Sequence, residues 1–385
     1  MKIDLVCPFF SPTVGGAESY SQGIASGMAA KGHDVTVHTS LYNPVTRERY
    51  PASEKMEPGF AVRRYDPSFR LYHYYWWWRP EIAKTDLIHL VCYGHACTEL
   101  TLSRYLGRFP IVNTTGMVDV PIQGPRSAWI KERYDRLIGV KRLKSVGKLI
   151  LWYQNERHWC LERGIPESQI EVLPIGIPGE SFSAYDAGPI KRREGLIRYI
   201  LYLGRIHPQR GVLSVAEAFS KIAGRFPDVD LVLAGPDNGA LAEVRKISGK
   251  RGVSARVKHL GVVLGRRKYE LISGCEFVAY PPMRELQGVV LLEAMAQKKA
   301  VISSGLDNGL PDYLRDGENG LQIKFGDIDG LADKMALLLT DDGLRRRLGE
   351  EGRGTAERFR LDKILDRTER IYLDVLNRTH ANGTR

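Results

Sequence analysis

Cysteine and metal-binding side chains are scarce in this sequence. Its 385 residues include five cysteines and nine histidines. No two cysteines form a CxxC motif and no histidines lie at the spacing of a metal site, which argues against a disulfide framework or a structural zinc site. A reducing compartment, the cytoplasm, fits this usage. The cysteines are Cys7, Cys92, Cys97, Cys160 and Cys275.

The sequence also lacks a long apolar run. A membrane-spanning helix needs about 18 or more consecutive apolar residues, and none is present. The first residues, MKIDLVCPFF, predict a strand that runs into Pro8 and not a signal peptide, because the apolar stretch is short and no A-x-A site follows. We expect a cytoplasmic location, with a peripheral position at the inner face of a membrane as an open alternative.

Acidic side chains are outnumbered by basic ones, 45 to 56, and the formal net charge is +11. Such an excess suits nucleic acid, an anionic membrane or an anionic substrate. The excess is local: residues 131–148 hold seven basic and two acidic side chains, and residues 245–268 hold nine basic and no acidic ones. No basic-aromatic nucleic-acid module is present, so we expect no nucleic-acid partner.

Short apolar runs alternate with helical patterns along the whole chain, which is typical of α/β proteins with parallel sheets. The length suits two domains. We predict Rossmann-like domains at 1–182 and 183–362, joined within the Gly-, Pro- and Ser-rich stretch 174–189. A helix at 363–385 is expected to pack back on the first domain. The predicted strands are Ile3–Cys7, Val35–Thr39, Ala61–Tyr65, Leu87–Val91, Ile111–Thr114, Leu149–Tyr153, Ile170–Leu173, Tyr199–Leu203, Asp230–Ala234, Val257–Leu260, Phe277–Tyr280, Ala300–Ser303 and Leu321–Ile323.

The first informative loop follows the first predicted strand. Ligands of such sheets bind beyond the carboxyl ends of the strands, and Ser11–Glu18 places Gly15 and Gly16 there, just before a helical pattern. Paired glycines let backbone N–H groups approach a phosphate at the helix N-terminus. A tight turn that merely needs glycine is the alternative.

The second loop follows the strand at Tyr199–Leu203 and carries Arg205 and Arg210. Two guanidinium groups on one loop can bind a diphosphate in bidentate fashion. A solvated basic loop is the alternative, but the position at the carboxyl end of a strand favours binding.

The third stretch, Pro281–Ala296, carries Glu285, Gly288 and Glu293. Gly288 predicts a helix start whose N–H groups can face an anion, and the two carboxylates can accept hydrogen bonds from hydroxyl groups on either side. Glu293 lies on an otherwise apolar helix, where burial without a partner is costly. An exposed helix glutamate is the alternative.

These three motifs, in this order, resemble glycosyltransferase family 4, the retaining, nucleotide-sugar-dependent enzymes of the GT-B fold. The most specific element is E-x7-E, from Glu285 to Glu293, followed by Ala-Met-Ala. The resemblance extends over nearly the whole chain. Further similar stretches are Gly32–Val35, Glu171–Ile177, Leu233–Pro236, His259–Val262, Asn308–Asp312 and Asp316–Gly320.

The resemblance implies a role for each matching side chain. Arg205 and Arg210 would hold the donor diphosphate, with Arg210 standing where the family usually has Lys. Glu285 would bind the donor sugar and Glu293 the nucleotide ribose. Backbone groups of Gly15 and Gly16 would contact the diphosphate, and those around Gly261 and Val262 the base. The backbone N–H groups of Gly288, Val289 and Val290 would contact the sugar or the phosphate.

The implied reaction is retaining transfer of a hexose from a nucleotide diphosphate sugar to a hydroxyl group. UDP-sugars are favoured and GDP-mannose comes next, and the acceptor would be a lipid-linked, polysaccharide or glycoconjugate precursor. Arg205, Arg210 and the helix start at Gly288 would stabilise the leaving diphosphate, a task that other folds give to a metal. We therefore expect no metal and no cofactor. Asp228-Val-Asp230 precedes a predicted strand, and we do not expect it to bind a metal.

Three alternatives remain open at this point. They are a natural-product glycosyltransferase, a nucleotide-sugar epimerase of the same fold, and a basic nucleic-acid- or membrane-binding protein without transfer activity. Three positions depart from the family. Thr115 stands where a sugar-contacting His is frequent, Gln287 where Phe is usual, and Ile175 where Asn is usual.

The first domain carries the features least like the family. Tyr72–Trp78 has six aromatic side chains in seven positions, which suits stacking on a sugar or a membrane interface; an aromatic core edge is the alternative. The candidate sugar or acceptor contacts are Trp77, His95 and Thr115.

The segment 129–148 predicts a basic amphipathic helix, with Ile130, Tyr134, Leu137 and Ile138 at helical spacing. Such a helix suits an anionic membrane surface. The alternative is an ordinary surface helix whose apolar side chains face the core.

Overall fold

The protein, described from a computed structural model, divides into two compact units. Unit 1 comprises Met1–Gly176 and Leu361–Arg385, and unit 2 comprises Ile177–Arg360. The first division falls inside the stretch 174–189, ahead of the domain end expected at residue 182. The structure describes residues 1–13, 15–44, 46–71, 75–116, 118, 125–285, 287–305 and 313–383.

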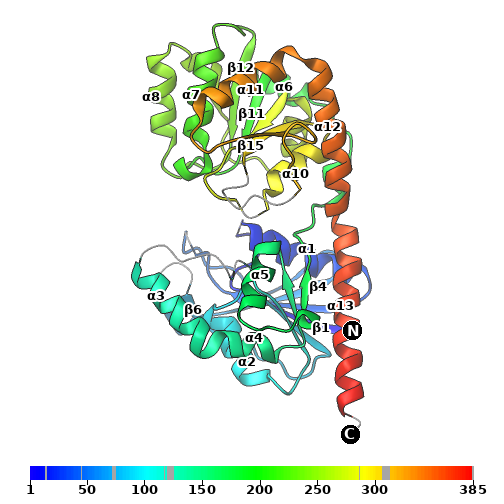
Figure 1. Cartoon of the computed structure of the whole chain (residues 1–385). Coiled ribbons are helices and arrows are strands. Elements are labelled where there is room, and N and C mark those ends of the chain that lie inside the picture. Colours follow the sequence, from blue (N-terminus) through cyan, green and yellow to red (C-terminus); the bar gives the residue numbers. More distant parts are fainter. Residues whose placement is uncertain are drawn as a thin grey trace. The chain divides into compact units, whose positions relative to one another are not determined.

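Unit 1 contains an eight-stranded sheet in the order β10-β9-β8-β7-β1-β2-β4-β3 (Figure 1). All neighbours pair in parallel except β3 and β4. Every residue of β7 and β8 is buried, so both faces of the sheet are covered there. The strands are β1 (Lys2–Val6), β2 (Asp34–Ser40), β3 (Ser53–Met56), β4 (Phe60–Tyr65), β7 (Leu87–Val91), β8 (Ile111–Thr114), β9 (Lys148–Leu151) and β10 (Ile170–Val172). The α-helices are α1 (Gly16–Ala30), α2 (Ala96–Tyr105), α3 (Pro125–Tyr134), α4 (Val140–Ser145), α5 (Gln154–Glu162) and α13 (Leu361–Gly383).

Unit 2 contains a parallel six-stranded sheet in the order β13-β12-β11-β14-β15-β16. Its strands are almost wholly apolar, and the core lies between them and the helices. The strands are β11 (Arg198–Leu203), β12 (Val229–Ala234), β13 (Val257–His259), β14 (Phe277–Ala279), β15 (Ala300–Ser304) and β16 (Leu321–Ile323). The α-helices are α6 (Gly188–Glu194), α7 (Val212–Ile222), α8 (Leu241–Lys250), α9 (Gly265–Gly274), α10 (Val289–Ala296), α11 (Ile328–Thr340) and α12 (Asp342–Ala356).

Both sheets are doubly wound, which confirms the predicted α/β architecture. In unit 1 the strand order reverses between β1 and β7, and in unit 2 between β11 and β14. Ligands of such sheets bind in the crevice at this reversal, outside the carboxyl ends of the strands. The loops after β1, β7, β11 and β14 are therefore the places to look for a site.

The elements that the sequence analysis missed lie in unit 1. One is β3 (Ser53–Met56), in which all residues but Met56 are polar. The others are β5 (Phe69–Leu71) and β6 (Tyr75–Trp77), which form a short hairpin. Trp76 and Trp78 are buried, in agreement with an aromatic core edge. All five cysteines are buried free thiols. Within the described ranges, no helix combines the length and apolar character needed to cross a bilayer.

Segment 129–148 is not the single helix that the sequence predicted. Between α3 and α4 the chain forms a π-helical turn, Asp135–Gly139, and Lys148 already belongs to β9. Tyr93 explains the turn: its hydroxyl donates to the Asp135 carboxylate at 2.8 Å and lies where any Cβ on Gly139 would be. The wider turn lets both residues contact Tyr93.

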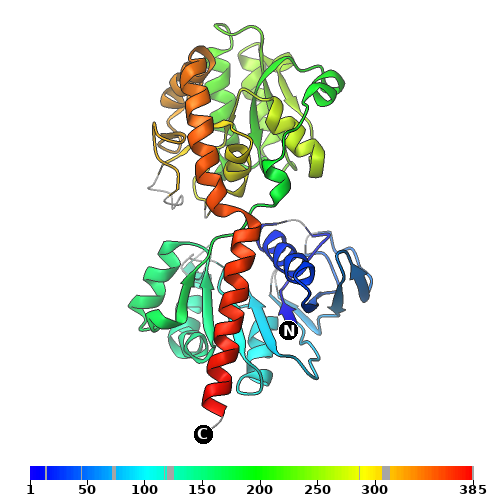
Figure 2. The same ribbon diagram turned by 90° about the vertical axis from the view of Figure 1, so that its right-hand side faces the viewer.

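The last helix, α13, packs against α1 and β8 within unit 1 (Figure 2). Lys31 at the end of α1 forms ion pairs with Asp366 and Glu369 of α13 at 2.6 and 2.8 Å. The apolar face of α13 is buried, and Tyr372 on that face is fully inaccessible to solvent.

Tyr372 belongs to a buried polar chain centred on His89 of β7. The Nδ1 atom of His89 shares a hydrogen bond with the Tyr372 hydroxyl at 2.6 Å, and Nε2 shares one with the Thr114 hydroxyl at 2.7 Å. Tyr20 of α1 reaches the same Thr114 hydroxyl at 2.9 Å. Burial lowers the pKa of His89 to about 3, so the imidazole is neutral in the folded protein at neutral pH.

We predict that His89 makes the protein less stable as the pH falls. The unfolded chain binds a proton on this residue below about pH 6.5 and the folded chain does not until about pH 3. Its contribution is therefore complete above pH 6.5 and is lost progressively between those values, by about 2 kcal/mol from pH 6.5 to pH 5. Urea unfolding of the wild type and His89→Gln checks this. Equal pH dependence in both proteins would contradict it.

Candidate functional site

The predicted side chains of unit 2 lie on two loops at the strand reversal of its sheet. Arg205 and Arg210 follow β11, and Glu285 follows β14, its neighbour in the sheet. The backbone N–H of Met283 donates to the Gln209 carbonyl at 2.8 Å and joins the loops. The fold thus brings Glu285 to the same edge as the two arginines, which lie at least 75 residues before it in the sequence.

Arg210 and Glu285 form the central contact of this edge. The Arg210 Nη1 donates to Glu285 Oε2 at 2.8 Å, and the Tyr280 hydroxyl donates to the same oxygen at 2.8 Å. Burial acts to lower the pKa of Arg210, but Tyr280 and Glu285 raise it by more. The two other contacts that the guanidinium makes with the described residues, to the Tyr280 hydroxyl and the Arg284 carbonyl, also use Nη1. Nε and Nη2 make no hydrogen bond within the described part of the chain, so one edge of the guanidinium can receive an anion.

The buried side chain of Tyr202 holds the backbone of the arginine loop, the loop after β11 that carries Arg205 and Arg210. The Tyr202 hydroxyl donates to the carbonyl of Arg205 at 2.8 Å and to that of Arg210 at 3.2 Å. Burial raises the pKa of Tyr202 well above its ordinary value, so the hydroxyl stays protonated and able to donate. The Arg205 side chain is exposed and makes no hydrogen bond or ion pair with the described residues.

Gly288 begins α10 in the left-handed conformation, with φ 64°, as its predicted position at a helix start requires. A Cβ there would lie 2.9 Å from the Tyr313 hydroxyl, which donates to the carbonyls of Gln287 and Gly288 at 2.7 and 3.2 Å. The first N–H groups of an α-helix have no intrahelical acceptor and attract anions. Val289 and Val290 supply these groups here.

Glu293 is 5% exposed, so the alternative of an exposed helix glutamate is wrong. Its Oε1 accepts from Lys268 Nζ at 2.5 Å and from the Tyr269 hydroxyl at 3.4 Å. Its Oε2 has no partner among the residues described and remains an acceptor for a ligand hydroxyl. Lys268 escaped the sequence analysis because nothing in the sequence relates α9 to α10.

The predicted base loop follows β13. The Gly261 carbonyl accepts from the Gly235 N–H at 2.7 Å, which ties this loop to the end of β12. Val262 is 53% exposed, so its apolar side chain is accessible to a ligand. Such a side chain can contact the face of a base.

In unit 1, Gly15 is the N-cap of α1, as predicted, and its backbone is extended. A Cβ on Gly15 would lie 2.2 Å from Glu18 Oε2, because the Glu18 carboxylate folds over the N-terminus of its own helix. Burial raises the pKa of this carboxyl group. The carboxyl group of Glu18 therefore lies against Gly15 at the start of α1.

The other candidates of unit 1 differ in exposure. Thr115 is fully buried, and its hydroxyl donates to Glu156 at 2.7 Å; Glu156 also accepts from the N–H groups of Val118 and Trp152. His95 is the half-buried N-cap of α2. The ring of Trp77, also half-buried, meets the ring of Phe69 edge-on at 5.2 Å. The sequence analysis missed Glu156, a buried carboxylate, because Thr115 and Val118 follow β8 and lie about 40 residues before it in the sequence.

No cluster of three or more His, Cys, Asp or Glu side chains that could hold a metal exists within the described ranges. Asp228 is paired with Arg198 at 2.8 Å, and Asp230 with Lys258 at 2.9 Å. Both carboxylates of the D-x-D sequence are thus engaged by cations of the protein.

Gly211, which ends the arginine loop, allows a prediction about stability. Its φ is +76°, and a Cβ would lie 1.9 Å from the Pro281 carbonyl oxygen. We predict that Gly211→Ala lowers the free energy of unfolding by about 2 kcal/mol or more. Gly224→Ala is the control, because its Cβ would meet nothing within 4 Å. Equal stability of the two variants in urea would contradict the geometry.

Relatives of known activity match almost the full length of the chain. It is 25% identical over 394 residues to N-acetyl-alpha-D-glucosaminyl L-malate synthase of Bacillus anthracis, covering 100% of this chain and 99% of that protein. It is also 25% identical to phosphatidyl-myo-inositol mannosyltransferase of Mycobacterium tuberculosis, over 97% and 96% of the two chains. Alpha-D-kanosaminyltransferase of Streptomyces kanamyceticus is 30% identical over 46% of this chain.

Solved structures share the fold over the whole chain. Sucrose-phosphate synthase of Thermosynechococcus elongatus has a TM-score of 0.75 at 21% identity, covering 97% of this chain and 99% of that one. The HepE protein of Anabaena, solved with UDP and glucose, has a TM-score of 0.71 at 17% identity, covering 96% and 98%.

Two family descriptions divide the chain between them. "Glycosyltransferase Family 4" matches residues 14–180, and "Glycosyl transferases group 1" matches residues 191–355. Together they span both units. The chain belongs to the family 4 type of glycosyltransferases, with the GT-B fold of two Rossmann-like domains.

Proposed function

We propose that this glycosyltransferase moves a hexose from a nucleotide diphosphate sugar to a hydroxyl acceptor, with retention of configuration and without a metal. UDP-sugars are the favoured donors and GDP-mannose comes next; the HepE structure of the same fold holds UDP and glucose. The observation that carries the proposal is the polar edge of unit 2. There Arg205, the open edge of Arg210 and the start of α10 offer donors to one anion.

The leaving diphosphate gains negative charge as the anomeric C–O bond breaks. Preorganised donors stabilise such charge most when they are already fixed in place. Arg210 is fixed by Glu285, and the α10 start by Tyr313, before any ligand binds. The Arg205 side chain makes no hydrogen bond or ion pair with the described residues, so its charge is available to the ligand.

Retention follows in this proposal from the state of Glu285. Its carboxylate is engaged by Arg210 and Tyr280, which suits a group that holds sugar hydroxyls better than a nucleophile. The acceptor would then attack from the side of the leaving group, whose phosphate oxygen takes the acceptor proton. A nucleotide-sugar epimerase would instead need a group that removes a proton from the sugar, a role that the engaged carboxylate of Glu285 suits poorly.

The acceptor side favours a lipid-linked substrate over a soluble natural product. The helical segment 125–145 exposes Trp129, Ile130, Leu137 and Ile138, each 45% exposed or more. The alternative of a stripe facing the core is therefore wrong. Exposed basic side chains lie among them at Arg133, Arg136, Lys141 and Lys144. We propose that this apolar and basic surface binds an anionic membrane.

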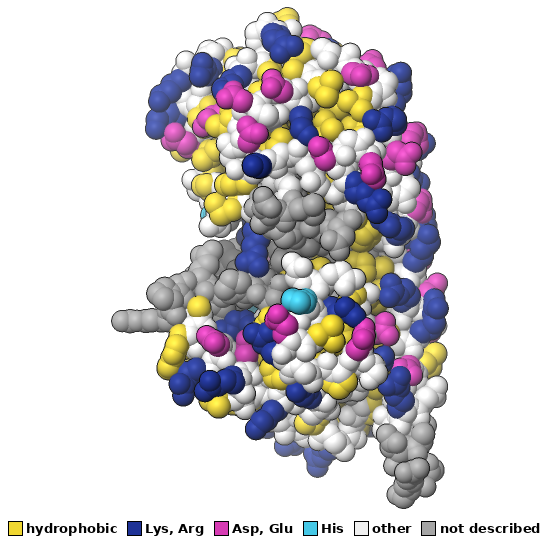
Figure 3. Space-filling view, in the orientation of Figure 1, with side chains coloured by type: hydrophobic (Ala, Val, Ile, Leu, Met, Phe, Trp, Pro, Cys, Tyr) yellow, Lys and Arg dark blue, Asp and Glu magenta, His cyan; other side chains and the backbone are white. Residues whose placement is uncertain are grey.

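Figure 3 shows basic and hydrophobic side chains gathered at the edge of the molecule that carries α3 and α4. The inner side of the segment is held by Lys131, which donates to Asp135 at 2.6 Å and to the Val118 carbonyl at 2.8 Å. The exposed side chains therefore project from an anchored segment. Little conformational freedom would be lost on binding to a surface.

For the donor edge we predict that Arg205→Ala lowers turnover at saturating donor by about 100- to 1,000-fold, the usual cost of removing one preorganised donor to a developing anion. Arg245→Ala on α8 is the control, because that side chain is also exposed and unpaired among the described residues. Initial rates with a UDP-sugar and an acceptor lipid measure both. Wild-type turnover in Arg205→Ala would refute the assignment.

For the membrane surface we predict that the protein sediments with phosphatidylserine vesicles at low salt and is released at high salt. Replacing Trp129 and Leu137 with Ser should weaken the partitioning at least about tenfold, because both side chains would be buried in the interface. Leu337→Ser, at a 42% exposed position of unit 2, is the control. No vesicle binding by the wild type at low salt would overturn the membrane proposal and leave the donor proposal standing.

A further inference from the structure

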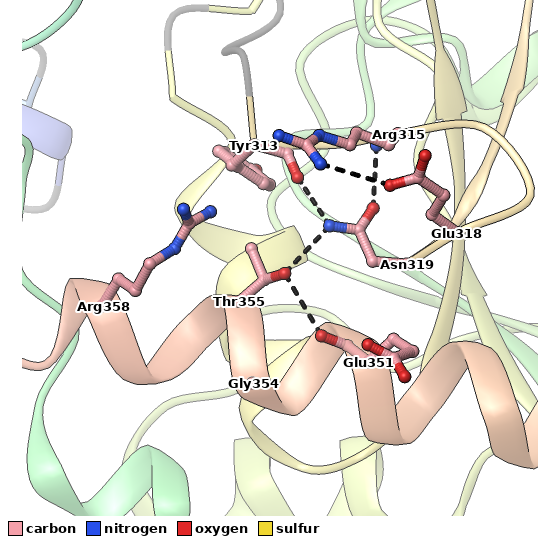
Figure 4. Close-up of a pocket in the computed structure, with 8 residues that line it drawn as sticks. All are labelled: Tyr313, Arg315, Glu318, Asn319, Glu351, Gly354, Thr355 and Arg358. Carbon is pink, nitrogen blue, oxygen red and sulfur yellow. Dashed lines mark hydrogen bonds and ion pairs between the residues drawn. The ribbon is translucent and has the colours of Figure 1, made fainter.

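A polar pocket of about 230 Å³ lies in unit 2 between the stretch 313–319 and the C-terminal end of α12 (Figure 4). None of its lining residues is proposed to contact the donor or the acceptor, and Tyr313 alone among them supports the start of α10. The lining is mostly charged or hydrogen-bonding. It consists of Tyr313, Arg315, Glu318, Asn319, Glu351, Gly354, Thr355 and Arg358.

The floor of the pocket is built without a ligand. Asn319 is 6% exposed, and its Nδ2 donates to the Tyr313 carbonyl at 2.6 Å and to the Thr355 hydroxyl at 2.9 Å. Its Oδ1 accepts from the Arg315 N–H at 2.7 Å. Gly354 leaves the α12 side of the pocket open, since a Cβ there would meet nothing within 4 Å. The recess is therefore a fixed feature of the fold.

Charge is divided between the two ends of the pocket. Figure 4 shows the guanidinium groups of Arg315 and Arg358 on the side of Tyr313, and the carboxylates of Glu318 and Glu351 on the other side. Arg358 makes no hydrogen bond or ion pair within the part of the chain that the structure describes. Among the described side chains Arg315 pairs with Glu318 alone, at 3.3 Å, and both side chains are 66% exposed. An exposed pair of this kind contributes little, so both guanidinium groups can take an anion.

We propose that this pocket binds a small oxyanion that also carries hydroxyl groups, such as a phosphorylated polyol. The guanidinium groups would bind the phosphate in bidentate fashion. The carboxylates at the opposite end would accept hydrogen bonds from the hydroxyl groups. The volume is below the usual range for drug-sized ligands, which limits the ligand to a few carbon atoms.

Tyr313 connects the pocket to the start of α10. Its hydroxyl donates to the carbonyls of Gln287 and Gly288, and its ring meets that of Phe359, next to Arg358, edge-on at 5.3 Å. An anion between Arg315 and Arg358 would hold both sides of this tyrosine. We infer that an occupied pocket steadies the α10 start and tightens nucleotide binding, a step that rests on the proposed function.

Titration calorimetry of the full chain with glycerol 3-phosphate tests the pocket. We expect Arg358→Gln to weaken binding at least about tenfold, and Gly354→Gln, which fills the recess, to abolish it. Arg245→Gln, at an exposed position of α8, and Gly224→Gln are controls that should bind as the wild type does. Inorganic phosphate should bind less tightly than glycerol 3-phosphate. Unchanged affinity in both Arg358→Gln and Gly354→Gln, or no binding by the wild type, would overturn the proposal.

The link to α10 is tested by the affinity for UDP, GDP and ADP with and without glycerol 3-phosphate. In the wild type, glycerol 3-phosphate should raise the affinity for the nucleotide at least about fivefold. In Arg358→Gln it should leave that affinity unchanged. The same response in both proteins would refute the link. Failure of all three nucleotides to bind would refute the proposed function instead, since the calorimetry of the pocket does not depend on it.

Discussion

The contact between Arg210 and Glu285 is the one on which the polar edge of unit 2 depends. It joins a loop after β11 to a loop after β14, at the point where the strand order reverses. With the pair in place, Arg210 presents only the edge of its guanidinium that carries Nε and Nη2. Loss of either side chain would remove the counter-charge that this contact supplies to a half-buried charged group, which is costly for both loops.

Buried tyrosines hold this pair and its surroundings. Tyr280 donates to Glu285, Tyr202 supports the backbone of both arginines, and Tyr313 holds the turn before α10. Burial raises the pKa of all three, so each hydroxyl is protonated and able to donate at neutral pH. Neutral donors from the core thus support the ion pair, and Arg205 and the open edge of Arg210 are left for a ligand. An apolar core alone could not fix these loops.

The sequence predicted the architecture well because parallel strands that are covered on both faces appear as continuous apolar runs. It missed β3, in which three of the four residues are polar and which lies at a sheet edge. It also merged α3, the π-helical turn and α4 into one helix, because the cause of the break, Tyr93, lies more than 40 residues earlier in the chain. Local pattern cannot report such a contact.

The same limit applies to the site. Arg205, Arg210, Glu285 and Glu293 were predictable because each follows a strand or lies in a specific motif. Lys268 and Glu156 were not, since only the folded chain brings them to Glu293 and Thr115. The exposure of Trp129 and Leu137 was equally out of reach, because helical spacing does not say which face is covered.

The central claim is that the loops after β11 and β14 bind a diphosphate. The most direct measurement compares the affinity of the wild type for each nucleoside diphosphate with that for its monophosphate, using UDP, GDP and ADP against UMP, GMP and AMP. The account predicts that the preferred diphosphate binds at least about tenfold more tightly than its monophosphate, and that Arg205→Gln loses this difference. Equal affinity for the diphosphate and monophosphate of every nucleoside would contradict it.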